Sequence, residues 1–243
     1  MADALLVENL TKHIGGIVLV DELDFVLETG TCLGVVGPNG AGKTSLFNLL
    51  DGTFGANRGR ILLHGVDITH TARHKRALLG VSRAFQVPQP FPDLTVYENV
   101  LTAATFAARK SGRDAARATA LVLERTGLSR AKGLLAGGLP LLDRKRLELA
   151  RALAAEPKLL LLDEIAGGLT EHEVNVLVEL VRSLKGRLSI IWIEHVAHAL
   201  LATCDRIMVL HFGRKVIEGE PNSVMASAEV REIYMGIAVD APA

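Results

Sequence analysis

The chain has 243 residues, of which 49% are hydrophobic, and its 27 basic and 27 acidic residues cancel to a formal net charge of zero. Such a chain can fill a substantial core. The neutral balance gives no electrostatic footprint for nucleic acid, so we expect no nucleic-acid partner. No apolar run approaches the roughly 20 residues of a membrane-spanning helix, and the first residues, MADALLVENL, lack the pattern of a secretory signal. We therefore expect a cytoplasmic chain.

The first predicted elements are strands. LLVENL and LDFVLETG, which are divided by turn residues, predict an antiparallel pair. TCLGVVG, LLLLDE and LSIIWIEH are continuous apolar strands that alternate with helical patterns, and such strands favour a mostly parallel sheet covered on both faces. We predict an α/β fold in which an antiparallel β lobe packs on the parallel core. Cys32 and Cys204 lie in apolar segments and are expected to be small core residues.

Between Phe85 and Ala154 the strand patterns stop. Three segments follow one another at helical period: TVYENVLTAATFAARK, GRDAARATALVLERTGL and LDRKRLELARALAA. They predict a helical insertion within the α/β domain. The stretch QVPQPFPDL, which begins at Gln86 and holds three prolines, continues neither a strand nor a helix and predicts a hinge at the start of the insertion.

A phosphate-binding motif, GPNGAGKTS, lies directly after a predicted strand and before the helix KTSLFNLL. It fits the pattern G-x-x-x-x-G-K-[ST], in which glycines let backbone amides and a helix N-terminus point at the phosphates of a nucleotide. Lys43 is expected to reach the β- and γ-phosphates, and Thr44 to offer its hydroxyl to Mg²⁺. The predicted nucleotide contacts in this motif are Gly37, Pro38, Asn39, Gly40, Ala41, Gly42, Lys43, Thr44 and Ser45.

Two further strands end in polar side chains. KLLLLDE places two carboxylates at the edge of the sheet where ligands bind in open α/β folds. Asp163 is a candidate Mg²⁺ ligand and Glu164 a candidate base for the attacking water, while an Asp that caps the following helix is the alternative. LSIIWIEH ends in His195. The strand pattern alone leaves two interpretations for it: a hydrogen-bond donor to the transferring phosphoryl group, or a satisfied polar group.

These segments, in this order and at these spacings, resemble the ATPase subunits of ABC transporters over nearly the whole chain. Within that family the chain is similar to importers of branched-chain amino acids and related hydrophobic or amide substrates, on RAFQVPQPFPDLTVYENV, RKRLELARALAAEPKLLLLDE and GEPNSVMASAEVREIYMG. The resemblance implies one ABC ATPase domain over residues 1–243, with a P-loop NTPase core. Residues 1–86 and 155–243 would form the antiparallel β lobe and the RecA-like core, and residues 87–154 the helical signature subdomain.

The resemblance also implies roles for single residues. Glu164, His195 and Lys43 would be catalytic, with His195 as the switch histidine. Gln86 would sense Mg²⁺ and the γ-phosphate and link them to the permease. The position that usually supplies an aromatic ring to adenine holds Ile14, so base stacking is expected to be weaker or to come from His13. The implied metal ligands are Thr44, Gln86 and Asp163.

ATP and Mg²⁺ are the implied cofactors. The implied partners are two transmembrane permease subunits, a sister ATPase or a second copy of this chain, and indirectly an extracytoplasmic solute-binding protein. Such a subunit is peripheral on the cytoplasmic face of the inner (plasma) membrane and soluble when isolated. Phe91, Leu94 and Tyr97 are candidates for the apolar contact with the permease, and internal packing of the helical subdomain is the alternative.

In this family a segment of consensus L-S-G-G-Q caps the ATP held by the facing ATPase. LAGGL at residues 135–139 is closer to the consensus, but LPLLD at residues 139–143 keeps the family spacing to Asp163, so we prefer the second register. There Pro140 removes a hydroxyl and an amide, and Asp143 brings negative charge toward the expected γ-phosphate. The basic residues 144–146 would offset part of that charge or form a solvated helix face.

This departure leads to one hypothesis and leaves alternatives. In the hypothesis the chain hydrolyses ATP in its own site, works beside a different sister ATPase and caps the sister's ATP poorly. Alternatively, both sites tolerate the divergent cap. A soluble ABC ATPase without a membrane partner and a small-molecule kinase are rival classes. The first usually carries a coiled-coil insertion or a second ATPase domain, and the second leaves Gln86 and His195 unexplained.

Overall fold

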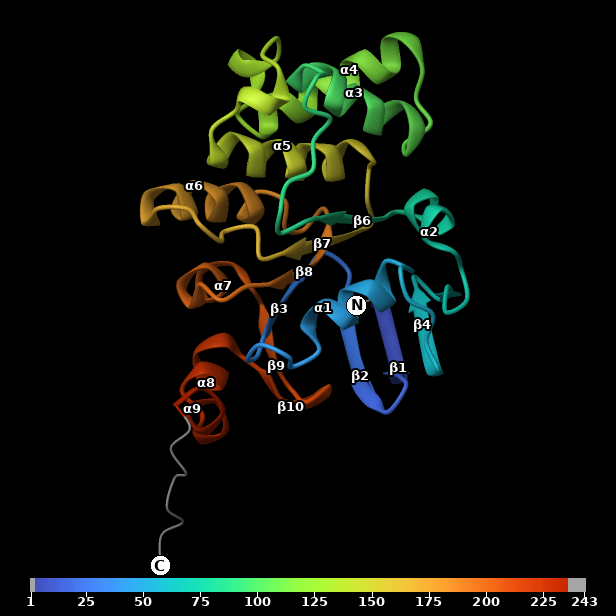
Figure 1. Cartoon of the computed structure of the whole chain (residues 1–243), viewed down its shortest axis with the longest axis vertical. Helices are drawn as coiled ribbons and strands as arrows, with labels where there is room; N and C mark the ends of the chain where they lie inside the picture. Colours follow the sequence, from blue (N-terminus) through green and yellow to red (C-terminus); the bar gives the residue numbers. More distant parts are fainter. Residues whose placement is uncertain (1–2, 236–243) are drawn as a thin grey trace, which may run out of the picture.

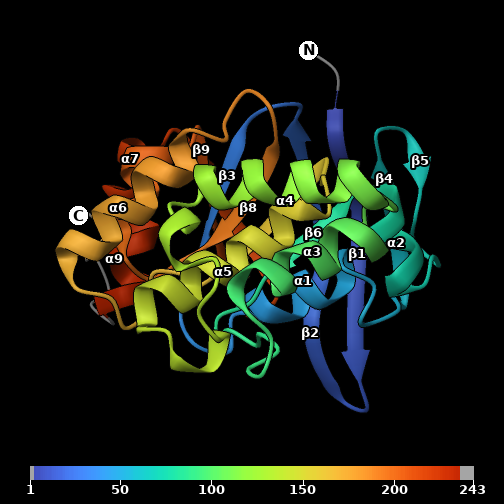
Figure 2. The same cartoon turned by 90° about the horizontal axis from the view of Figure 1, so that it is seen from above.

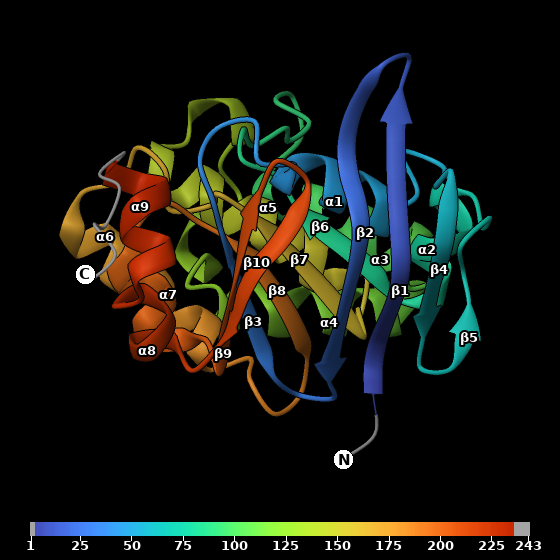
Figure 3. The ribbon, with the colours of Figure 1, turned by 90° about the horizontal axis from the view of Figure 1, so that it is seen from below.

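The computed structural model describes residues 3–235. Four strands within residues 3–67 form an antiparallel sheet, in the order β2-β1-β4-β5. Leu5, Val7 and Leu10 of β1 are buried, so one face of the sheet packs on the core, as strand alternation allows. The predicted antiparallel pair is confirmed, and Figure 3 shows it as a long twisted ribbon. The strands are β1 (Asp3–Ile14), β2 (Ile17–Glu28), β4 (Arg58–Leu63) and β5 (Val66–Asp67).

The central sheet is mostly parallel, with the order β10-β9-β3-β8-β7-β6. Among the strands of residues 3–235, β10 is the one that pairs antiparallel in this sheet, with β9. Every residue of β3, β7 and β8 is buried, which is typical of strands covered on both faces. The mostly parallel core predicted from these apolar runs is therefore confirmed. Its strands are β3 (Cys32–Val36), β6 (Val81–Ala84), β7 (Leu159–Asp163), β8 (Ser189–Ile193), β9 (Arg206–His211) and β10 (Arg214–Gly219).

Alternate residues of the central strands feed two separate cores. Leu161 and Ile191 point into a cluster shared with α1 and the antiparallel sheet. Leu162 and Trp192 point into a second cluster, shared with α5, α6 and α7. Figure 1 shows the sheet between these two layers. The helices around it are α1 (Lys43–Leu50), α2 (Arg73–Leu79), α6 (Glu171–Arg182), α7 (Ala197–Thr203), α8 (Pro221–Met225) and α9 (Ala228–Met235).

Three further helices form a separate layer: α3 (Val96–Phe106), α4 (Gly112–Arg125) and α5 (Leu141–Ala154). They share a core of their own around Val100, Leu123 and Leu147. A capping box formed by Thr95 and Glu98 begins α3, which satisfies amides that the first turn leaves unpaired. Figure 2 shows this layer lying across the sheet. The predicted helical insertion is present, whereas its boundaries at residues 87 and 154 stay a prediction.

Two smaller expectations concern the core and the membrane. Cys32 and Cys204 are both buried, as predicted, and their sulfur atoms lie 3.4 Å apart. Among the helices within residues 3–235, none combines the length and the apolar character needed to cross a membrane. Residues 1–2 and 236–243, including Gly236 of the tail motif, lie outside the described part. The single domain expected over residues 1–243 stays a prediction.

Candidate nucleotide site

The phosphate loop joins β3 to α1 at the carboxyl edge of the central sheet. Two positions of this loop must be glycine, because other backbone segments pass very close to them. A Cβ on Gly37 would lie 2.3 Å from the carbonyl oxygen of Leu210, and a Cβ on Gly42 would lie 2.4 Å from that of Leu19. Gly42 also has a φ of +100°, which residues with a Cβ rarely adopt. The loop therefore presents backbone amides at the N-terminus of α1, as phosphate binding requires.

Lys43 is the first residue of α1, and its side chain folds over this loop. Its Nζ donates hydrogen bonds to the carbonyl oxygens of Gly37, at 2.6 Å, and Pro38, at 3.0 Å. Burial lowers the pKa of Lys43, while the carboxylates of Glu164 and Asp163 act in the opposite direction. The ammonium group therefore contacts the loop carbonyls and also lies within the electrostatic reach of the acidic strand end.

Glu164 follows the last residue of β7 and brings two other predicted site residues together. Its Oε1 lies 2.7 Å from Nε2 of His195, and its Oε2 accepts a hydrogen bond from Nε2 of Gln86. The backbone of Glu164 has a φ of +45°, a conformation that costs a non-glycine residue about 1–3 kcal/mol and is typical of functional sites. Three segments far apart in the sequence thus meet at one carboxylate.

Lys145 on α5 joins this group, although its role was not predicted. Its Nζ donates a hydrogen bond to the carbonyl oxygen of Gln86 and lies 3.5 Å from that of Glu164. The side chain is buried, and burial lowers the pKa of Lys145. A solvated helix face is therefore the wrong interpretation for this position. Lys145 falls at helical spacing with the buried residues Leu149 and Ala152, and that period could have indicated it.

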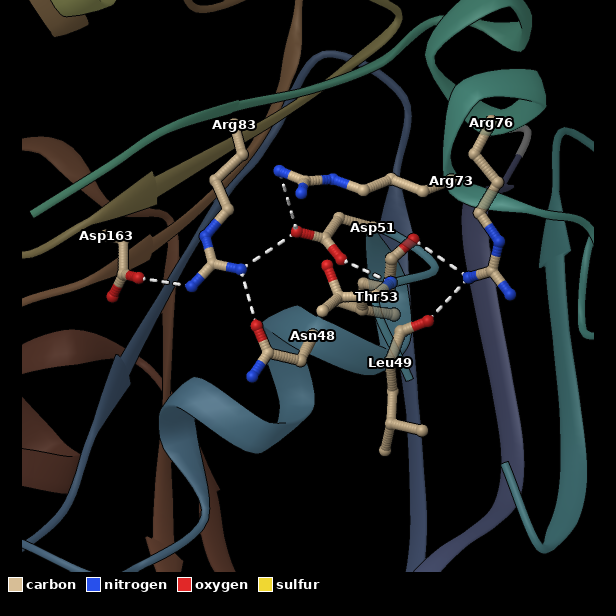
Figure 4. A network of polar contacts seen from close by, with 9 residues as sticks. Asn48, Leu49, Asp51, Thr53, Arg73, Arg76, Arg83 and Asp163 are labelled. Carbon is tan, nitrogen blue, oxygen red and sulfur yellow. Dashed lines mark hydrogen bonds and ion pairs between the residues drawn. The ribbon is translucent and has the colours of Figure 1, made fainter. Parts of the chain in front are cut away.

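Asp163, the last residue of β7, pairs with an arginine that no local sequence pattern indicates. Arg83 on β6 donates from Nη2 to Oδ2 of Asp163 at 2.5 Å. Its other arm donates from Nη1 to Asn48, at 2.8 Å, and to Asp51, at 2.9 Å. Figure 4 shows this network beside the end of α1. The helix after the acidic pair, α6, is capped by Thr170, so the alternative role of Asp163 as a cap is wrong.

The predicted adenine and metal contacts at the rim are more exposed. Thr44 lies in the first turn of α1 with an exposed side chain, and Ser45 beside it is half-buried. Ile14 ends β1 and is 54% exposed, and Ile17 and Val18 across the turn are exposed as well. The residue expected at the adenine position, Ile14, therefore belongs to an exposed apolar hairpin tip and not to an aromatic platform.

The preferred signature register spans the start of α5. Pro140 is the N-cap residue of this helix, while residues 136–138 of the rival register form a separate 3-10 turn. Asp143 in the first turn lies 3.2 Å from Arg146, so a basic neighbour offsets its charge, as one interpretation expected. Leu141 packs against the loop after β7, because a Cβ built on Gly168 would lie 3.4 Å from its Cδ2.

The three apolar candidates for a permease contact differ in their surroundings. Phe91 is 47% exposed, and the guanidinium of Arg151 lies 5.2 Å from the centre of its ring. Leu94 is half-buried. Tyr97 packs against the core of the helical layer. Internal packing thus accounts for Tyr97, and Phe91 leaves an apolar surface at the start of the helical layer.

Residues 20–167 match the family model described as ABC transporter. BraF, the high-affinity branched-chain amino acid transport ATP-binding protein of Pseudomonas aeruginosa, is 33% identical to this chain over 95% of the chain and 96% of BraF. The chain belongs to the ABC transporter family. This ABC subunit is also 30% identical to LptB, the lipopolysaccharide export system ATP-binding protein of Haemophilus influenzae, over 96% of the chain and 97% of LptB.

A solved ATP-binding cassette of an ABC transporter, in its ADP conformation, has the same fold. It superposes with a TM-score of 0.87 at 28% identity, and the alignment covers 98% of this chain and 100% of the cassette. The resemblance to the family and the predicted fold class are therefore confirmed. The protein is the ATP-binding subunit of an ABC transporter, an ATPase whose hydrolysis of ATP is coupled to transport.

Proposed function

We propose that this subunit drives an importer of branched-chain amino acids or related small solutes. One observation carries the catalytic part of the proposal: Gln86, Glu164 and His195 converge beside the phosphate loop, with Glu164 bonded to both of the others. The similarity to BraF supports the choice of substrate. LptB matches at a similar identity, so export of lipopolysaccharide is the second candidate.

In this proposal the phosphate loop binds the β- and γ-phosphates of ATP. Lys43 moves its ammonium group from the carbonyls of Gly37 and Pro38 to the phosphates, which are stronger acceptors. The free amides at the start of α1 hold the rest of the negative charge. The remaining loop residues shape this cradle, and Ile14 offers an apolar contact to the base.

The donor set beside the loop fits Mg²⁺, which prefers oxygen ligands. The Thr44 hydroxyl, the Asp163 carboxylate and the Gln86 side-chain oxygen are such ligands, and all three come from segments that meet at the carboxyl edge of the sheet. When bound, Mg²⁺ neutralises charge on the phosphates. Gln86 would exchange its hydrogen bond with Glu164 for this contact.

Glu164 is the proposed general base. When the Gln86 amide releases its hydrogen bond, Oε2 of Glu164 would be free to accept a proton from the water that attacks the γ-phosphate. Nε2 of His195 lies within hydrogen-bond distance of Oε1 of Glu164, and in the transition state this N–H would donate to the phosphoryl group instead. Lys145 holds the backbone of both Gln86 and Glu164.

The proposed assembly places the subunit on the cytoplasmic face of the inner membrane. Two permease subunits form the translocation pathway, and Phe91 contributes to the surface that contacts them. An extracytoplasmic solute-binding protein delivers the substrate. The partner ATPase is a different sister chain, because Pro140 carries no amide hydrogen and Asp143 brings negative charge to the start of α5. The chain then completes one strong site and one weak site.

Uptake of radiolabelled leucine in cells that lack this chain tests the substrate. We expect uptake to fall, to return with the wild-type chain and to stay low with Lys43→Ala, which folds the same loop without the phosphate contact. Delivery of lipopolysaccharide to the cell surface is measured in parallel. Normal leucine uptake together with lost delivery would replace the importer by the second candidate.

A further inference from the structure

Arg83 is a buried cation enclosed by acidic and aromatic side chains. Only 6% of its side chain is exposed, as is 6% of Asp51 and 8% of Asp163. Its guanidinium carbon lies 4.9 Å from the ring centre of Phe85 and 5.4 Å from that of Phe47. The two aromatic rings and the hydrogen bonds of Nη1 and Nη2 together restrict the planar guanidinium to one orientation.

The two arms of this guanidinium point to different parts of the nucleotide site. Nη2 donates to Asp163 at the end of β7. Nη1 donates to Asn48 and Asp51 at the last turn of α1, and α1 is the helix that begins with Lys43 and Thr44. Arg83 therefore ties the acidic strand end to the helix of the phosphate loop, as Figure 4 shows.

We propose that Arg83 is a positioning residue for the metal-binding carboxylate of Asp163. The bond engages Oδ2 and thereby restricts the rotation of the carboxylate, which would leave Oδ1 as the oxygen for the metal. Partners that orient a metal ligand usually matter 10–100-fold for metal affinity. This inference rests on the proposed function, which assigns Asp163 to Mg²⁺.

Charge alone leads to the opposite expectation. Arg83 is a cation beside a metal site, so its removal would make Mg²⁺ bind more tightly if charge were its whole effect. A positioning role makes Mg²⁺ bind more weakly after the same change, because the carboxylate loses its fixed rotation. The sign of the effect therefore separates the two roles.

Arg76 provides a matched control at the other side of α1. It is 1% exposed and donates to backbone carbonyls, including those of Leu49, Leu50 and Thr69. It is as deeply buried as Arg83 and packs against the same helix end (Figure 4), but its hydrogen bonds do not reach Asp163. Its replacement loosens the same region without touching the carboxylate.

The experiment measures ATP affinity by calorimetry, in EDTA and at increasing MgCl₂, in chains that also carry Glu164→Gln so that ATP is not consumed. For Arg83→Gln we expect unchanged affinity in EDTA and an approximately tenfold rise in the Mg²⁺ concentration that gives half of the gain in affinity. Arg76→Gln should leave that concentration unchanged. An unchanged or lower Mg²⁺ requirement for Arg83→Gln, or an equal rise for Arg76→Gln, would overturn the proposal.

Two further variants separate charge from geometry and guard against misfolding. Arg83→Lys restores the charge without the two-armed fork, so it should resemble Arg83→Gln, and a full recovery would contradict the positioning role. Asn48→Ala keeps Arg83 and every local charge but removes one acceptor of its Nη1 arm. It should raise the Mg²⁺ requirement by a smaller factor, and no rise would count against the proposal even if both Arg83 variants failed to fold.

The same titration distinguishes this inference from the proposed function. Chains that keep Arg83 must first show that ATP affinity rises with Mg²⁺. If it does not, the metal site of the proposed function is wrong, and the proposal for Arg83 is overturned with it. If it does and Arg83→Gln behaves identically, only the proposal for Arg83 is wrong.

Discussion

Two helix N-termini in this protein have the same backbone dipole but different chemistry. The start of α1 follows a glycine loop and carries Lys43, which lies over the loop carbonyls. The start of α5 follows Pro140 and carries Asp143, which pairs with Arg146. A helix N-terminus favours anions only where amides are free and no acid lies in front of them. The first end therefore fits phosphate, and the second is poorly suited to cap one.

The largest expected effect concerns the first of these ends and its proposed base. Glu164→Gln should lower ATP hydrolysis by about 10²–10⁴-fold because general-base catalysis is lost. ATP binding should persist, since the phosphate loop and Lys43 are unchanged. Phosphate release and calorimetry measure the two quantities. Glu171→Gln, an exposed acid in the first turn of α6, is the control, and hydrolysis at the wild-type rate by Glu164→Gln would remove the residue from the mechanism.

The next effect concerns the second end. A chain with Pro140→Ser, Leu141→Gly, Leu142→Gly and Asp143→Gln regains free amides, a hydroxyl and close backbone approach. Each restored donor to transition-state charge is worth about 10²–10³-fold in a well-formed site. We expect ATP turnover of the isolated chain to rise and to depend steeply on protein concentration. Unaltered turnover would mean that the wild-type segment already caps a site adequately.

A smaller effect tests the contact that links α5 to Gln86 and Glu164 of the nucleotide site. Lys145→Met removes the donor to the carbonyls of Gln86 and Glu164 and should lower the free energy of unfolding by about 1–3 kcal/mol. Arg144→Met, at an exposed position on the same helix, should lower it less. Denaturant titrations of both variants provide the comparison, and equal losses would show that the buried contact contributes little.

The lowered pKa of Lys145 adds a pH dependence to this test. Because the unfolded chain holds the lysine proton more tightly, the wild-type protein gains stability as pH rises through the folded pKa toward the ordinary value of 10.5. Lys145→Met lacks this gain. The stability difference between the two proteins should therefore widen with pH in that window, and a constant difference would argue against a buried cation at this position.

The smallest effect concerns the charge at the start of α5. Asp143→Asn removes an acid from the first turn and its pair with Arg146, which should lower the free energy of unfolding by about 0.3–1 kcal/mol. Asp114→Asn, in the first turn of α4, is a matched change in another helix. A stabilised Asp143→Asn protein would show that this acid does not complement the helix dipole.

Local patterns predicted much of the fold and part of the site. The glycine loop and the apolar strands were predictable because their chemistry is written in consecutive residues, and the structure places Gln86, Glu164 and His195 together. Arg83 was not predictable from such patterns, and for Lys145 the helical period indicates burial but not its partners. Their partners lie on other elements, 80 residues away for Arg83 and Asp163, and a lone arginine or a basic run is usually a solvated feature.

The solution mass of Glu164→Gln protein by light scattering, with and without Mg-ATP, tests the central claim most directly. Blocked hydrolysis should trap any pair of chains that ATP bridges. If residues 139–143 form a poor cap, the chain should keep the mass of a monomer in Mg-ATP. Calorimetry on the same sample should show that ATP is nevertheless bound. A clear ATP-dependent shift to the mass of a dimer would contradict this account, because LPLLD would then close a site.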